Sequence, residues 1–149
     1  MISNKIQSLL TTIGLTQEQL AIFCNTETPD LETTINKLKK LDSLIEEFIL
    51  SEVNKFIAGE DHNVILIRFI AEDDFALYEP ELFDTFKFCS VHKQFIARTR
   101  EAIERIGGKV SITYMESNFY ETWLGVNDFD DSADIRTTWA RQQIRDLNY

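Results

Sequence analysis

The chain has 149 residues, of which 44% are hydrophobic, and its 25 acidic and 15 basic side chains give a formal net charge of −10 at pH 7. This length predicts a single domain, 1–149, and the apolar fraction excludes a disordered chain. The surplus of negative charge argues against general nucleic-acid binding, because that affinity depends on basic side chains that displace counterions from phosphates.

Residues 1–58 are predicted to form a helical N-terminal part. An amphipathic pattern over 2–13 predicts a first helix, which Gly14 ends. Thr16 and Gln19 have the spacing of a capping box, in which each side chain bonds the backbone of the other residue at a helix start. A second, short helix is therefore expected from this point.

Thr28-Pro29 is expected to open a third helix, because proline suits the first helical position. Apolar residues then follow at spacings of three and four. From the sequence this segment is either one helix to Ile57 or two helices broken near Asp42-Ser43.

Residues 59–149 are predicted to form an α+β part. The run NVILIRFI at 63–70 is continuously apolar and rich in β-branched residues, which favours a buried central strand. The pattern over 80–106 predicts one long helix. Alternation over 109–125 favours a β-hairpin, with a helix that begins at Ser117 as the alternative. The expected fold is thus α+β and predominantly helical, with a small sheet packed by the long helix and by N- and C-terminal helices.

The segment GVNDFDDSADI contains four closely spaced carboxylates: Asp128, Asp130, Asp131 and Asp134. An EF-hand calcium loop that began at Asp128 would need glycine at its sixth position and glutamate at its twelfth. Ala133 and Trp139 stand there instead, so no metal site is predicted. Asp131 or Ser132 is expected to cap a C-terminal helix, with an acidic contact surface as the alternative interpretation.

Catalytic signatures are sparse. The sequence lacks the Gly-x-Ser-x-Gly elbow of a serine nucleophile, and its five glycines form neither a phosphate loop nor a dinucleotide fingerprint, so no cofactor is expected. Glu72, Asp73 and Asp74 follow the predicted strand and could serve a carboxylate- or metal-dependent enzyme, although a solvated loop is the simpler interpretation. Cys89 and His92 have a spacing that can bring both toward one metal ion, but the two further ligands are not fixed.

Arg68 is the charged residue inside the apolar strand, on the face of Val64 and Leu66. Such an arginine should pair with a carboxylate or contact an anion or a partner. Trp123 and Tyr120 lie in an unusually aromatic C-terminal third, and large aromatic side chains serve both cores and protein interfaces.

The segment LTQEQLAIFCNTETPDLETTINKLKKL, 15–41, resembles a helix-turn-helix DNA reader. The resemblance implies that its second helix enters the major groove, where Lys37, Lys39 and Lys40 lie only at the end of that segment. A transcription-related DNA binder is accordingly the third functional hypothesis.

The leading hypothesis is a non-enzymatic regulatory protein of the inhibitor, immunity or adaptor type that binds a partner protein. Its expected interaction residues are Asp128, Asp130, Asp131, Asp134, Trp123, Tyr120 and Arg68. A small carboxylate- or metal-dependent enzyme is the alternative, and the sequence leaves a homo-oligomer open. Two well-separated cysteines and the lack of a long apolar run or signal peptide favour a cytoplasmic location without a membrane span.

Overall fold

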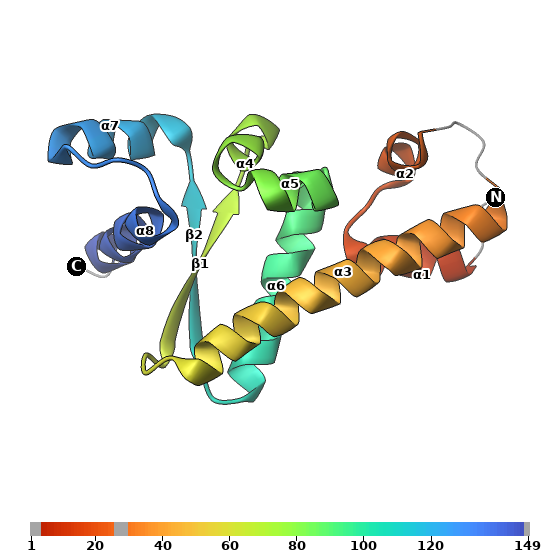
Figure 1. Cartoon of the computed structure of the whole chain (residues 1–149), viewed down its shortest axis with the longest axis horizontal. Helices are drawn as coiled ribbons and strands as arrows, with labels where there is room; N and C mark the ends of the chain where they lie inside the picture. Colours follow the sequence, from red (N-terminus) through yellow and green to blue (C-terminus); the bar gives the residue numbers. More distant parts are fainter. Residues whose placement is uncertain (1–3, 26–29, 148–149) are drawn as a thin grey trace.

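The computed structural model describes residues 4–25 and 30–147, with the backbone alone for 145–147. These residues form eight helices and two strands, so the predicted α+β, mostly helical fold is confirmed (Figure 1). In chain order the elements are α1 (Asn4–Ile13), α2 (Gln17–Cys24), α3 (Leu31–Ala58), β1 (Asn63–Phe69), α4 (Glu72–Tyr78), α5 (Pro80–Phe86), α6 (Cys89–Arg105), β2 (Lys109–Met115), α7 (Ser117–Asn127) and α8 (Ala133–Leu147).

The two strands pair in parallel, with Asn63 opposite Lys109 and Phe69 opposite Met115. The predicted hairpin over 109–125 is therefore wrong, and the alternative of a helix beginning at Ser117 is right. The reason is that Tyr120 and Leu124, both buried, lie one helical turn apart and face the core together from α7.

Helices cover both faces of this small sheet. In Figure 1, α6 and α8 lie on opposite sides of the strands, and both helices contact β1 and β2. A strand that is covered on two faces reads as a continuous apolar run even where one of its edges has no neighbour. The expectation of a central strand at 63–70 is therefore wrong, because β1 is an edge strand among the described residues.

The single long helix expected over 80–106 is also wrong. The chain forms α5 and α6 instead, separated at Lys87, which has a left-handed backbone with φ 67°. The acidic residues after β1, for which the sequence favours a solvated loop, open another helix, α4. Three helices thus connect the end of β1 to the start of β2 (Figure 1).

The N-terminal helices follow their local signals. Thr16 and Gln19 form the predicted capping box, with side-chain to backbone distances of 3.0 and 3.1 Å. The predicted opening of the third helix at 28–29 lies outside the described residues. From Leu31 to Ala58 α3 is continuous, and Asp30 caps it by accepting a hydrogen bond from the Thr33 N–H at 2.9 Å.

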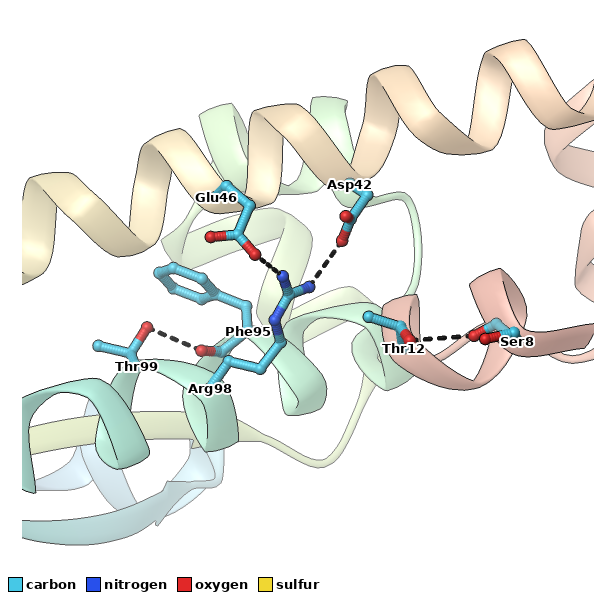
Figure 2. A network of polar contacts seen from close by, with 7 residues as sticks. All are labelled: Ser8, Thr12, Asp42, Glu46, Phe95, Arg98 and Thr99. Atoms are coloured by element: carbon cyan, nitrogen blue, oxygen red, sulfur yellow. Dashed lines mark hydrogen bonds and ion pairs between the residues drawn. The ribbon is translucent and has the colours of Figure 1, made fainter. Parts of the chain in front are cut away.

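An arginine joins α6 to α3. Figure 2 shows Arg98 reaching from α6 toward Asp42 and Glu46, which lie one turn apart on α3. The Arg98–Asp42 distance is 2.9 Å, and the Arg98 side chain is only 19% exposed. Nearby, the buried Thr99 hydroxyl donates to the Phe95 carbonyl at 2.7 Å, so it needs no partner outside its own helix (Figure 2).

One cluster of buried side chains extends from Ile6 in α1 to Ala140 in α8. Its most aromatic part lies between β1, α4, α5 and α6 and is built from Phe69, Phe75, Phe86, His92 and Phe95. None of the helices in the described ranges is long and apolar enough to span a membrane.

Candidate binding groove at the free edge of β1

The backbone register leaves one edge of β1 unpaired. The Lys109 N–H donates to the His62 carbonyl at 2.8 Å, so even-numbered residues of this strand direct their backbone groups toward β2. Ile65 and Ile67 direct theirs to the opposite edge. Within the described part of the chain, no hydrogen bond reaches the N–H or C=O of either residue.

This edge lies in a groove made of two adjoining hollows of about 310 and 250 Å³. The C-terminal half of α3 and the N-terminal half of α8 line both hollows, through Glu52, Lys55 and Thr137. Consecutive residues of β1, from Asn63 to Ile67, line the space between them. The unpaired backbone groups are therefore inside a groove of the size that accommodates a ligand.

Three ion pairs occupy the rim of this groove. Lys55 lies 3.1 Å from Glu52 within α3, and Arg141 of α8 lies 3.1 Å from Asp61, which precedes β1. The third pair joins Arg136 of α8 to Asp131 at 2.8 Å. Each rim cation thus already has a carboxylate partner.

Besides the exposed Glu60, a second carboxylate of the groove, Glu79, has no ion pair with the described residues. It lies between α4 and α5, is half-buried, and forms neither an ion pair nor a side-chain hydrogen bond with the described residues. Burial raises the pKa of its carboxyl above 4.5, while Arg136 and Lys55 act in the opposite direction. Glu79 is therefore the half-buried acidic group among the described groove residues that a ligand can pair.

His92 lines the same groove from α6, beside the apolar side chains of Leu82, Phe95 and Ile96. The residue is 3% exposed, and its ring lies 4.7 Å from the Phe75 ring, measured between centroids. Burial, helped by the positive charge of Arg68, lowers the pKa of His92 to about 4, so the imidazole is neutral near pH 7. This end of the groove is apolar.

The predicted interaction residue Asp131 supports the groove wall. It accepts hydrogen bonds from the buried Tyr120 hydroxyl and from Arg136, whose guanidinium lies over the Tyr78 ring. Burial is the main cause that raises the pKa of Tyr120, and the Asp131 carboxylate adds to it. Tyr120 is fully buried, so its side chain is not on the surface.

The other predicted acidic residues lie apart from the groove lining. Asp128 ends α7 with φ 56°, Asp130 is exposed, and Asp134 lies in the first turn of α8. The Ser132 hydroxyl accepts a hydrogen bond from the Ile135 N–H at 3.1 Å, which confirms the expected cap. Trp123 is half-buried and donates to Gln142 at 3.0 Å, a bond that joins α7 to α8.

Arg68 is bound to an aromatic residue, whereas the sequence favoured a carboxylate. Its guanidinium donates to the Tyr114 hydroxyl at 2.9 Å and lies 4.8 Å from the centre of that ring. The two residues are opposite each other in the β1–β2 register, a pairing that the predicted hairpin over 109–125 does not contain.

The carboxylates proposed for an enzyme have structural contacts. Both oxygens of Glu72 lie 3.0 Å from the Cys89 N–H at the start of α6, and Asp74 lies 3.4 Å from the Ser117 N–H at the start of α7. Burial, with Glu72 nearby, raises the pKa of the Cys89 thiol to about 12. Among the residues described, no three His, Cys, Asp or Glu side chains are grouped to hold a metal ion.

Sequence reasoning missed the groove because its parts come from distant segments. Neither Glu79 nor Arg136 belongs to a periodic pattern or a motif in the sequence. The one available clue was the pair Glu79-Pro80, since a residue before proline is biased against helix and marks a boundary between elements.

No protein-family model matches the sequence, and comparison with curated proteins finds no match. The chemistry of the groove is therefore the basis for a functional proposal.

A Glu79→Gln substitution is expected to stabilise the protein near neutral pH. Because the folded pKa of Glu79 is raised, the protonated carboxyl contributes to stability. This contribution is fully present below about pH 4.5 and is lost as pH rises through the folded pKa. Thermal unfolding of both proteins from about pH 4 to 8 measures this effect. The unfolding temperature of the variant should exceed that of the parent at the alkaline end and equal it at the acidic end. Glu81→Gln, at an exposed site on α5, is the control, and an equal gain there would contradict the assignment.

Proposed function

We propose that this chain is a non-enzymatic protein-binding module, and that its partner adds an extended segment to the free edge of β1. The observation that carries the proposal is the row of unpaired backbone groups at Ile65 and Ile67 inside the groove. A peptide strand that enters there gains main-chain hydrogen bonds, while the flanking side chains select its sequence.

The small size of the sheet supports this mode of binding. Parallel strands occur mostly in larger sheets, and two strands alone are a minimal unit. Exposed edges are usually blocked by bulges, prolines or covering segments, because they attract other strands. In the described part of the chain, no bulge, proline or covering segment blocks the edge of β1 at Ile65 and Ile67, and the groove between α3 and α8 lies beside this edge.

Glu79 indicates that the entering segment of the partner carries a basic side chain. A lysine or arginine of the entering segment would pair a carboxylate that has no ion pair among the described residues, and such a bond is stronger than a neutral one. The net charge of −10 also favours a basic partner, because electrostatic attraction speeds the encounter of the two proteins. A basic, extended segment is therefore the ligand that this groove fits.

A carboxylate-dependent enzyme is a second candidate, favoured by the raised pKa of Glu79 in a groove that also contains His92. Carboxyl groups with raised pKa values serve as general acids. The Glu79→Gln variant separates the two functions. It should weaken partner binding about tenfold if it removes one charged hydrogen bond, but should abolish turnover in an enzyme.

An Ile67→Pro substitution is expected to abolish partner binding while the fold persists. Proline removes the N–H that faces the groove, but it leaves the β1–β2 ladder intact, because residue 67 does not bond to β2. The measurement is affinity capture from the native cell extract with the parent and variant as bait, followed by mass spectrometry. The captured protein should be lost with the proline variant.

Ile67→Ala is the matched control, since it shortens the same side chain and keeps the N–H. It should retain the captured protein. Hydrogen exchange of the free chain adds a second readout: the amides of Ile65 and Ile67 should exchange faster than those of Leu66 and Arg68, and binding should slow them. Equal capture by the proline and alanine variants would rule out strand addition at this edge.

A further inference from the structure

A third hollow, of about 330 Å³, lies on the N-terminal side of the molecule between α2, α3 and the end of α5. Phe23, Leu41 and Leu44 form its apolar floor, and Thr85 also lines it. Leu41 is buried, whereas Phe23 and Leu44 are half-buried and keep apolar surface open to the hollow. No residue of this hollow belongs to the groove beside β1.

Its charged residues are mostly basic, although the chain is acidic. Lys37, Lys40 and Lys87 line the hollow, with Asp84 as the one carboxylate among the described residues. None of these lysines lies within 4.0 Å of a described carboxylate, whereas Lys55 and every arginine of the groove rim do. The hollow therefore combines apolar surface with cations that no described acidic side chain neutralises.

Lys87 reaches this position at a conformational cost. Its φ of 67° is left-handed, a region that costs a residue with a side chain roughly 1–2 kcal/mol relative to the right-handed one. The position ends α5, where glycine is the usual residue. Lys87 thus supplies a cation to the hollow at a site where glycine would favour the fold.

We propose that this hollow binds an anionic amphiphile, that is, an apolar chain or ring that carries one carboxylate, sulfate or phosphate group. The apolar part would cover Phe23 and Leu44, and the anionic group would lie among the three lysines. Duplex DNA also pairs with lysines, but it offers no apolar body for the floor. In addition, six residues separate α2 from α3, more than the three or four of a helix-turn-helix.

Titration calorimetry with decanoate, below its micelle concentration, tests the proposal on the full chain. Binding is expected for decanoate, whereas acetate and decanol, which each lack one half of the chemistry, should bind at least tenfold more weakly. Amide chemical shifts should change at Phe23, Leu44 and Lys87. A 1:1 signal that maps to the β1 groove would overturn the proposal, as would equal binding of decanol.

Two variants of equal charge make the test specific. Lys40→Gln combined with Lys87→Gln should weaken decanoate binding about fourfold to ninefold, since each exposed charge contributes roughly twofold to threefold. Lys93→Gln combined with Lys109→Gln should change it less than twofold. Equal loss in both double variants would show a nonspecific charge effect and reject the site.

Lys87→Gly separates binding from folding. It should raise the unfolding temperature, because glycine accepts the left-handed backbone, and it should weaken decanoate binding. Unchanged binding in this more stable variant would remove Lys87 from the site. Tighter binding of a short duplex DNA than of decanoate, reduced by the first double variant, would replace the proposal with nucleic-acid recognition.

Discussion

A Gly14→Ala substitution is expected to lower the free energy of unfolding by about 3 kcal/mol or more, the largest single-residue effect on stability that we predict. Gly14 ends α1 with φ 95°, where a side chain is strained. An added Cβ would also lie 2.4 Å from the Ser90 carbonyl oxygen and 2.6 Å from Cγ of Gln94. Because one of these atoms is backbone, α1 and α6 would have to move apart.

Gly107→Ala is the matched control for this prediction. Gly107 has the same φ of 95°, but a Cβ there would meet nothing within 4 Å. Its loss should be only about 1 kcal/mol, which is the cost of the backbone conformation alone. Urea unfolding of both variants gives the comparison, and equal losses would show that close approach of α1 to α6 does not limit stability.

Local sequence signals predicted the ends of several helices, because the backbone groups at each of these ends are hydrogen-bonded by residues close in sequence. Gly14 ends α1, Thr16 caps α2 and Ser132 caps α8, as the sequence indicated. A cap joins residues about three positions apart, so a short segment of the sequence contains all the residues needed to recognise it.

Strand pairing could not be predicted in this way, because it joins residues 46 positions apart. The segment after Met115 contains Tyr120, Trp123 and Leu124, a spacing that suits a helix, but aromatic and β-branched residues also favour strands. The choice is settled by burial, since α7 packs Tyr120 beside Tyr78 and Trp139. This environment depends on the whole fold.

The sequence predicted less of the candidate groove than of the fold. A run such as NVILIRFI reports that both faces of a strand are covered, but it carries no information about its edges. Glu79 is important only because α3, α5 and α8 meet around it. By contrast, the four aspartates that the sequence emphasised lie between the end of α7 and the first turn of α8, and among them Asp131 alone connects to the groove, through Arg136.

Those contacts also explain why the wall formed by α8 can be firm next to an open strand edge. The Tyr120 hydroxyl and Arg136 both bind Asp131, and Tyr78 donates to Glu121 of α7 at 2.5 Å. The two tyrosines pack edge to face, which joins α4 to α7, and Tyr120 also packs against Trp139 of α8. A preformed wall lowers the entropy cost of ordering the groove when a partner strand enters.

Acidification is expected to destabilise the protein through His92, by about 3 kcal/mol between pH 6.5 and 4. The folded pKa of His92 is lowered, so the neutral imidazole contributes to the free energy of unfolding. This contribution is present above pH 6.5 and is lost as pH falls toward the folded pKa of about 4. The ring lies among Phe69, Phe75 and Phe86, where a charged imidazole is poorly solvated. Urea unfolding at a series of pH values measures the loss.

The variant His92→Gln isolates this contribution. It should be less stable than the parent at pH 7, because it loses ring contacts, but its stability should fall less steeply between pH 6.5 and 4, since glutamine does not titrate. His62→Gln removes the other histidine of the chain, at an exposed site, and should leave the slope unchanged. Parallel curves for the parent and His92→Gln would mean that His92 is protonated without cost, which would require water to reach the apolar end of the groove.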